Sequence, residues 1–229
     1  MERAAGASSA KPAKNLCWYC ENESTAGPFC EHCAKIQPAG PGMDYFQFMG
    51  LQRRLQIDLN DLQRRFYALS RKFHPDYYHN SGEYEQGLSL ENSATLNQAY
   101  RALREPFARA EYLVRLFQGS DKEISASPPH ELLEEVFEFN ERLQEFRTIS
   151  QGERAKSLAT ELENDRRTFE EKDAALRAAL EELFRRWDAA SDAREDTAEL
   201  LEELRALLSQ RKYIQNAVRD ITEALGCLT

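Results

Sequence analysis

The spacing of apolar residues limits what this 229-residue chain can fold into more than any other feature of its sequence. Over most of the chain after residue 58, apolar side chains recur at intervals of three and four and so line one face of an α-helix. The clearest stripe consists of Leu59, Leu62, Phe66, Leu69 and Phe73. Apart from a short pair in the cysteine-rich segment near the N-terminus, no stretch alternates polar and apolar residues as a strand would. The spacing therefore predicts an all-α fold.

A proline ends the first of these helices. Asp58 is a favourable N-cap for it. Pro75 lacks an amide hydrogen and disfavours helical torsion angles in the residue before it, so the helix should end at or just before His74. A polar loop at residues 80–87 leads into a second one-sided stripe, made of Leu96, Ala99, Tyr100 and Leu103. The two predicted helices flank an exposed corner with the sequence His-Pro-Asp at 74–76.

Two further helices are predicted around this pair. A short one opens at Asp44, after a run of alternating Pro and Gly at residues 38–42 that marks a boundary. Another begins at Pro106, which suits a first helical turn, and extends to Gly119.

Three long apolar stripes follow a linker at residues 120–129 that is rich in Ser and Pro. The first stripe consists of Leu132, Val136, Phe139, Leu143 and Phe146. The second, from about Glu153, consists of Leu158, Leu162, Phe169, Leu176, Leu180, Leu183 and Trp187. The third, from about Asp192, consists of Leu200, Leu204, Leu207, Ile214, Val218, Ile221 and Leu225. Three such helices joined by short loops predict an antiparallel three-helix bundle.

The charge of the chain excludes some classes of partner. Lys and Arg number 30 against 39 Asp and Glu, which gives a net charge of −9 and disfavours nucleic acids and anionic membranes. No apolar run approaches the roughly 18 to 20 residues that span a bilayer. Residues 1–15 are small and polar, so they are predicted to be disordered, and they resemble neither a secretory signal nor a transit peptide. We therefore expect a cytoplasmic protein, or a mitochondrial one if the source is eukaryotic.

Four cysteines form two tight pairs at residues 16–37. Cys17 and Cys20 are separated by nine residues from Cys30 and Cys33, and four thiolates at this spacing favour tetrahedral, structural zinc. His32 can only substitute for one of them, because a structural site closes at four ligands. The same sulfurs suit an iron-sulfur cluster, and a redox CxxC is the other alternative, although it requires a thioredoxin-like scaffold that the sequence lacks. Cys227 reads as a free thiol.

A basic face lies opposite the first apolar stripe. The face consists of Arg64, Arg65, Arg71 and Lys72. Arg71 follows Arg64 by seven residues and Lys72 follows Arg65 by seven, so the four side chains stack on one side of a helix. Residues 53–76 hold six basic and three acidic side chains in an otherwise acidic protein. Elsewhere this pattern would indicate an ordinary solvated helix face. Directly before a His-Pro-Asp corner it favours a binding surface.

In this context the His-Pro-Asp corner resembles that of a J domain. The segment 92–103, followed by Pro106 and by residues 109–113, is similar to the third-helix region of HscB-type co-chaperones of iron-sulfur cluster assembly. The order of a J domain and a C-terminal helical bundle is similar too, so the resemblance covers residues 44–226, more closely in its first half. Some eukaryotic relatives in this family carry a comparable tetracysteine module.

The resemblance implies two protein partners. An Hsp70-type chaperone would have its ATPase stimulated by His74, Pro75 and Asp76 together with the basic face, and an IscU-type scaffold would bind the bundle. Carried over from the family, the scaffold-contacting positions are Leu133, Phe137, Glu138, Glu141 and Tyr213. Glu134 stands where the family often has Met or Ile.

The pattern of the first bundle helix supports such a surface independently. Leu133 and Phe137 are i and i+4 neighbours beside the core stripe and widen it past what three helices need, and glutamates border them. The alternative is that both residues belong to the core of a tightly wrapped helix.

These patterns together predict a disordered N-terminus at 1–15, a zinc knuckle at 16–37, a J-domain helical hairpin at 43–119 and a three-helix bundle at 128–227. The sequence holds no phosphate-binding Gly-rich loop and no arranged nucleophile, so we expect a co-chaperone and not an enzyme. The alternatives are a J-domain protein with a different client and a metal or redox protein centred on the cysteines.

Overall fold

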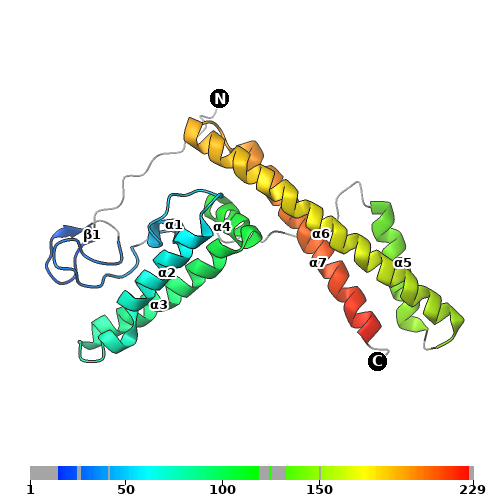
Figure 1. Ribbon diagram of the computed structural model, residues 1–229, viewed down its shortest axis with the longest axis horizontal. Helices are drawn as coiled ribbons and strands as arrows, with labels where there is room; N and C mark the ends of the chain where they lie inside the picture. Colours follow the sequence, from blue (N-terminus) through cyan, green and yellow to red (C-terminus); the bar gives the residue numbers. More distant parts are fainter. Residues whose placement is uncertain are drawn as a thin grey trace. The chain divides into compact units, whose positions relative to one another are not determined.

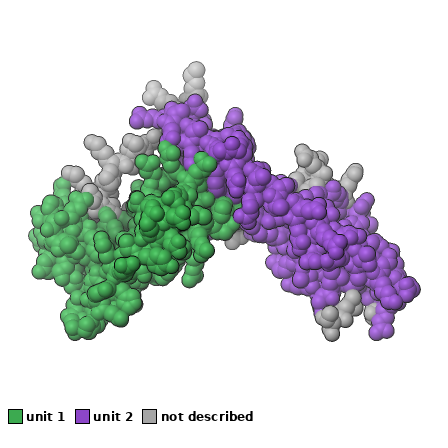
Figure 2. Space-filling view, viewed as in Figure 1, with its two compact units in different colours: residues 1–109 green, residues 110–229 purple. Residues whose placement is uncertain are grey.

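The computed structural model describes residues 15–24, 27–40, 42–118, 124, 133–149 and 151–226. The expectations for residues 1–14, for most of the linker at 120–129 and for Cys227 lie outside these ranges. The chain forms two compact units, residues 1–109 and 110–229, which are coloured separately in Figure 2. Each unit is described by itself.

The cysteine-rich segment opens the first unit. Strand β1 (Asn15–Leu16) pairs antiparallel with β2 (Glu23–Ser24), and a single bridge joins Phe29 to Ile36. This strand pair is the one that the sequence allowed near the cysteines. The side chain of Ile36 is fully buried, so the segment has a small apolar centre of its own beside the thiols.

Most of the rest of this unit is formed by helices α1 (Tyr45–Phe48), α2 (Leu59–Phe73) and α3 (Glu83–Arg104). Asp44 starts α1 in a capping box with Gln47, and Asp58 accepts a bond from Asn60 as the N-cap of α2. The helices α2 and α3 pack side by side as a hairpin (Figure 1). The core between them and α1 is built from Phe46, Phe48, Met49, Leu55, Leu62, Phe73, Leu96, Ala99 and Leu103.

Two helix starts differ from the sequence-based prediction. Helix α3 begins at Glu83, so Gly87 lies inside the helix and not in the preceding loop. Gly82 takes the N-cap position, and Glu83 and Glu85 complement the helix dipole in the first turn, which offsets the roughly 1 kcal/mol that an interior glycine costs relative to alanine. Asp192 lies within the long second bundle helix, because the chain leaves that helix only at Arg194, in a left-handed conformation.

Helix α4 (Pro106–Gln118) starts at the predicted proline. Phe107, Ala110, Leu113 and Val114 are buried along one side, as their spacing requires. Near its end, the Phe117 ring packs edge-on against Trp187 with ring centroids 5.3 Å apart.

The second unit contains α5 (Leu133–Thr148), α6 (Glu153–Ala193) and α7 (Ala198–Gly226). The 41 residues of α6 extend about 60 Å at 1.5 Å per residue. Helix α7 returns along α6, and the shorter α5 packs against the N-terminal part of α6 (Figure 1). The predicted stripes form the core, which includes Val136, Phe139, Leu143, Phe146, Leu158, Leu162, Phe169, Leu180, Trp187, Leu204, Ile214 and Ile221.

The described part of the chain is therefore all-α apart from the small strand pair. Among its helices, none combines the length and the apolar character that crossing a bilayer requires.

Two neighbouring phenylalanines on α5 test this packing. The side chain of Phe139 is 3% exposed and that of Phe137 is 64% exposed. We expect Phe139→Ala to lower the free energy of unfolding by about 3–5 kcal/mol, because it leaves a cavity against Phe169. Phe137→Ala should change it by no more than about 0.5 kcal/mol. Urea unfolding followed by circular dichroism measures both, and equal losses would contradict the assigned core.

Candidate functional sites

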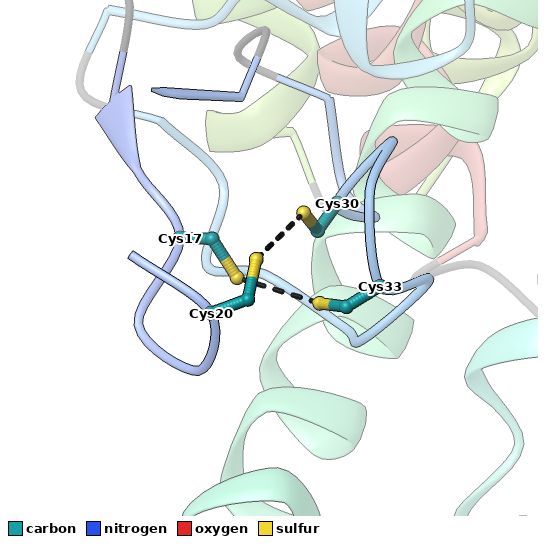
Figure 3. A group of neighbouring side chains, drawn as sticks. All are labelled: Cys17, Cys20, Cys30 and Cys33. Carbon is teal, nitrogen blue, oxygen red and sulfur yellow. Dashed lines mark hydrogen bonds between the residues drawn. The ribbon is translucent and has the colours of Figure 1, made fainter. Parts of the chain in front are cut away.

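The four predicted cysteine ligands come together in one cluster. The sulfur of Cys17 lies 3.7 Å from that of Cys33, and the sulfur of Cys20 lies 3.7 Å from that of Cys30 (Figure 3). All four sulfurs lie within 4.8 Å of one another. These sulfur–sulfur separations exceed the length of a disulfide bond, about 2.05 Å, by far, so the thiols are free.

Two similar turns present these thiols. The backbone N–H of Tyr19 points at the Cys17 sulfur at 3.4 Å, and the N–H of His32 points at the Cys30 sulfur at the same distance. Each turn closes through a residue with positive φ, Glu21 in the first pair and Ala34 in the second. Backbone donors aimed at sulfur stabilise a thiolate, so the turns prepare both cysteine pairs for the charged form.

The pKa values of the thiols show how strongly the four sulfurs interact. Burial raises the pKa of Cys17, but backbone N–H groups of Cys20 and Tyr19 and the adjacent thiols lower it to about 6. A backbone N–H of Lys35 lowers the pKa of Cys33, but burial and the other three sulfurs outweigh it and raise that pKa to about 12. One thiol ionises readily and another resists, and a cation at the centre would favour the charged form of all four.

The cluster fits such a cation. Four thiolates at about 2.3 Å from a tetrahedral zinc ion lie about 3.8 Å from one another, which matches the separations observed between sulfurs. His32 is not part of the cluster, because its Nε2 lies 3.1 Å from the Glu23 carbonyl oxygen. The donor set is therefore four sulfurs, as a closed structural site requires.

The His-Pro-Asp corner forms a short 3₁₀ helix, η1 (Pro75–Tyr77), directly after α2. His74 ends α2 and caps η1, because its Nδ1 accepts a bond from the Asp76 backbone N–H at 3.3 Å. The side chain of Asp76 is 88% exposed, and its carboxylate lies 3.5 Å from the imidazole of His74. The corner thus presents a carboxylate to solvent on a short, ordered turn.

Contacts from α3 and from the following loop hold this corner. The hydroxyls of Ser89 and Ser93 both donate to the Phe73 carbonyl, at 2.6 and 3.2 Å. The Tyr78 hydroxyl donates to the Lys72 carbonyl at 3.0 Å. These bonds satisfy the last carbonyls of α2, which have no partner within the helix. Nothing in the sequence pattern singles out these three hydroxyls, since a Ser on a helix or a Tyr in a turn carries no positional signal.

The predicted basic face divides into two parts. Arg64 and Arg65 both pair with Asp61, at 3.1 and 2.7 Å, and hydrogen bonding from Arg65 lowers the pKa of that carboxyl. Arg65 also donates to the Gly50 carbonyl at 2.6 Å, so it ties the preceding loop to α2. Arg71 and Lys72 are exposed in the last turn of α2. The exposed positive charge of Arg71 and Lys72 therefore lies next to the corner.

The predicted scaffold surface lies on α5. Phe137 is exposed, which excludes the alternative that it belongs to the core. Glu138 and Glu141 are exposed on the same helix, and Glu138 lies 3.6 Å from Arg142. Tyr213 of α7 is half-buried, and burial raises its pKa while the Asn140 side chain of α5 lowers it by less. The side chain of Leu133, like that of Glu134, lies outside the described residues.

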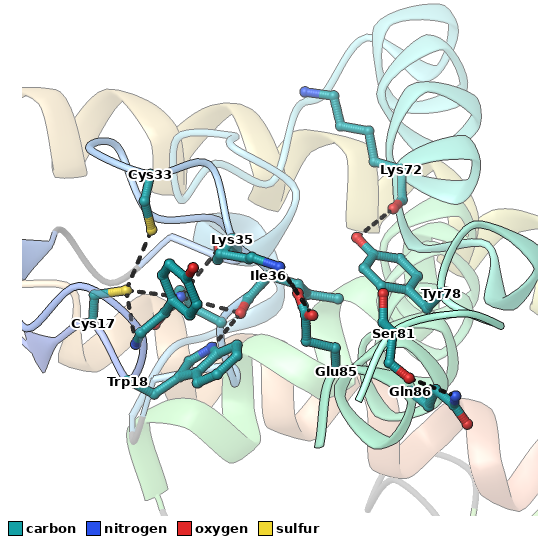
Figure 4. A network of polar contacts seen from close by, with 12 residues as sticks. Cys17, Trp18, Cys33, Lys35, Ile36, Lys72, Tyr78, Ser81, Glu85 and Gln86 are labelled. Atoms are coloured by element: carbon teal, nitrogen blue, oxygen red, sulfur yellow. Dashed lines mark hydrogen bonds and ion pairs between the residues drawn. The ribbon is translucent and has the colours of Figure 1, made fainter. Parts of the chain in front are cut away.

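The cysteine segment is docked against the α2–α3 hairpin, which the sequence did not indicate. The Phe29 ring stacks on Phe73 with ring centroids 5.1 Å apart. Lys35 pairs with Glu85 at 2.8 Å (Figure 4). Contacts between residues more than 40 positions apart leave no periodic trace in a sequence. Buried polar residues such as Asn92 contact the cysteine segment. In the sequence, Asn92 is recognisable only as a polar residue within a helical stripe.

Comparisons with known proteins agree with this architecture. No family model matches the chain. It is 29% identical to the iron-sulfur cluster co-chaperone protein HscB of Mus musculus over 224 residues, 94% of this chain and 85% of the mouse protein. It is 34% identical to the HscB homolog of Arabidopsis thaliana over 129 residues, 56% of this chain and 51% of that protein.

A solved structure gives the same result for the fold. The crystal structure of human co-chaperone protein HscB matches with a TM-score of 0.61 at 26% identity, covering 91% of this chain and 98% of the human one. The tetracysteine cluster precedes the helical hairpin and the bundle in this chain. In sequence and in fold, the chain is thus similar to the HscB-type iron-sulfur cluster co-chaperones.

Proposed function

We propose that this protein is a non-enzymatic co-chaperone of iron-sulfur cluster assembly. Its J domain, taken as residues 43–119, stimulates the ATPase of an Hsp70-type chaperone, and its bundle, taken as 128–227, delivers an IscU-type scaffold. The observation that carries the proposal is the exposed His-Pro-Asp corner, held by α3 directly beside a basic helix end, in a chain similar to HscB co-chaperones.

The chemistry of the corner suits recognition. The exposed Asp76 carboxylate can pair with a cation of the chaperone, while Arg71 and Lys72 offer positive charge five and four residues earlier in the chain. Opposite charges set this close to each other fix the orientation of a partner with the complementary arrangement. In this proposal the exposed corner supplies contacts, and hydrolysis belongs to the chaperone.

The α5 surface suits an apolar protein partner with basic edges. Phe137 projects a large ring into solvent, and Glu138 and Glu141 lie close to it on the same helix. An exposed aromatic residue that enters a partner's pocket supplies much of the binding energy of an interface, and charged residues at the rim set orientation. The scaffold is proposed to bind here.

The metal of the knuckle is proposed to be structural zinc. Zinc, when bound, would hold the two cysteine turns together through four thiolates. Outside the cluster, the apolar centre of the segment is little more than Ile36. A segment this small cannot fold on such a core alone, so metal binding supplies its folding free energy.

The first prediction concerns Asp76. In single-turnover ATP hydrolysis by a DnaK-type chaperone, the native protein should accelerate hydrolysis, and Asp76→Asn should reduce the acceleration about tenfold or more, since the amide cannot pair with a cation. Glu91→Gln, which neutralises an exposed carboxylate on α3, is the matched control and should retain full stimulation. No acceleration by the native protein would refute the proposed function.

The second prediction concerns Phe137. Calorimetric titration with an IscU-type scaffold should show about tenfold or greater loss of affinity for Phe137→Ala, since the exposed ring is the apolar centre of the surface. Leu90→Ala, which removes an exposed apolar side chain from α3, should bind as the native protein does. Unchanged affinity for Phe137→Ala would assign the scaffold to another surface.

The third prediction concerns the metal ligands. Cobalt(II) bound in place of zinc should give the intense visible absorption of a tetrahedral site with four thiolates. Cys33→Ser should weaken and shift these bands because one sulfur is lost, whereas His32→Ala should leave them unchanged, since His32 faces the Glu23 carbonyl. A shift in the histidine variant, with none in the cysteine variant, would contradict the assigned ligand set.

A further inference from the structure

The knuckle reaches the end of α2 through one aromatic side chain. The Phe29 ring lies almost parallel to that of Phe73, at an interplanar angle of 6° and a centroid distance of 5.1 Å. The ammonium group of Lys72 lies 5.5 Å from the centre of the same Phe29 ring. Phe29 therefore contacts both residues that immediately precede the His-Pro-Asp corner.

A second path connects the metal ligands to α3. The side-chain amide of Gln37 donates to the Cys17 sulfur at 3.3 Å. The backbone carbonyl of Gln37 accepts a bond from the Asn92 side chain at 2.8 Å, and Asn92 is buried on α3. One residue thus links a cysteine of the cluster to a helix that supports the corner.

Two further contacts join the same surfaces. Lys35, which lies between the second cysteine pair and Gln37, forms an ion pair with Glu85 of α3. The Trp18 ring, which lies next to Cys17, packs edge-on against Tyr84 with centroids 4.9 Å apart, and its Nε1 donates to the Ile36 carbonyl (Figure 4). Trp18, Phe29 and Lys35 lie within two residues of a cysteine, and Gln37 lies four residues after Cys33.

The corner depends on where Phe73 lies. The Phe73 carbonyl accepts two hydroxyl bonds from α3, and its ring is fully buried against Phe48 and Phe29. A ring that loses one stacking neighbour becomes free to move in its pocket, because the contacts of a packed side chain are lost outright on the vacated side. Motion of Phe73 is transmitted to His74 through a single peptide bond.

We propose that the tetracysteine knuckle is a metal-dependent brace of the His-Pro-Asp corner, and that Phe29 is the positioning residue that carries the state of the cluster to Lys72 and Phe73. With metal bound, the knuckle is folded and its contacts with α2 and α3 hold the corner in one arrangement. Without metal, the knuckle unfolds, and Phe29, Lys35 and Gln37 leave the hairpin. The corner then opens locally more often, while α2 and α3 stay folded on their own core.

The proposed effect of metal binding on the corner is argued from these contacts alone. The effect of the corner on a chaperone rests in addition on the proposed function. When the knuckle braces the corner, Lys72 and Asp76 are already held in the arrangement that binds a partner. An unbraced corner has to be ordered on binding, which costs free energy and weakens association without changing the chemistry of the contact.

Hydrogen exchange of the full-length protein tests the coupling. Zinc-loaded and chelator-treated protein, both kept reduced, are compared by mass spectrometry over peptides that cover residues 71–78. We expect exchange in this segment to be about tenfold faster without zinc, while peptides from residues 96–103 of α3 stay protected. Equal exchange of residues 71–78 in the two states would overturn the proposal, and this comparison needs no variant.

Variants then assign the coupling to Phe29. Zinc-loaded Phe29→Ala should exchange at residues 71–78 as fast as the zinc-free native protein while keeping one zinc per chain by native mass spectrometry. Phe29→Tyr keeps the ring and should restore slow exchange. Leu16→Ala removes a knuckle side chain that is 70% exposed and should have no effect. Slow exchange of residues 71–78 in zinc-loaded Phe29→Ala would show that Phe29 does not connect the cluster to the corner.

A dose–response assay separates this inference from the proposed function. With a DnaK-type chaperone, Phe29→Ala should raise the concentration for half-maximal ATPase stimulation several-fold and leave the maximum unchanged, because His74, Pro75 and Asp76 are intact. A lowered maximum with an unchanged half-maximal concentration would contradict a positioning role. If the native protein gives no stimulation at all, the proposed function fails, and the exchange data still decide whether the brace exists.

Discussion

Phe73 holds the first unit together, since the hairpin, the knuckle and the corner all meet at this residue. Its ring closes the core against Phe48 and receives Phe29 from the knuckle, and its carbonyl accepts the hydroxyls of Ser89 and Ser93. Both halves of the residue are therefore used, the side chain for packing and the main chain for polar contacts. Because the next residue is His74, every one of these contacts bears on where the His-Pro-Asp corner lies.

The charge of α2 also becomes clearer from its ion pairs. The sequence predicts a long basic face on α2. In the structure, however, Arg64 and Arg65 form ion pairs with Asp61, and Arg65 also donates to the Gly50 carbonyl. What remains is concentrated in the last turn, at Arg71 and Lys72, where positive charge also complements the negative end of the helix dipole. The arrangement moves the available charge toward the corner, so one partner can contact both.

Most of the fold was predictable from sequence because it rests on local rules. Apolar spacing predicted each long helix, Pro75 and Pro106 marked boundaries correctly, and the spacing of Cys17, Cys20, Cys30 and Cys33 predicted their convergence. The start of α3 was placed too late, because Gly87 reads as a helix breaker, although the acidic first turn of α3 offsets its cost. The docking of the knuckle was missed altogether, since Phe29 meets Phe73 and Gln37 meets Asn92 only through the tertiary fold.

On α5, the proposed recognition surface and the packing surface are formed by different side chains of the same short helix. Phe139 is buried against Phe169, whereas Phe137, two residues away, is exposed. Arg142 binds Asp165 of α6 with two hydrogen bonds, at 2.9 and 3.0 Å, and contacts Glu138 only as a third partner. A cation of a binding partner can therefore take over Glu138 without breaking the bridge between α5 and α6. Binding at this surface need not cost the bundle any of its own contacts.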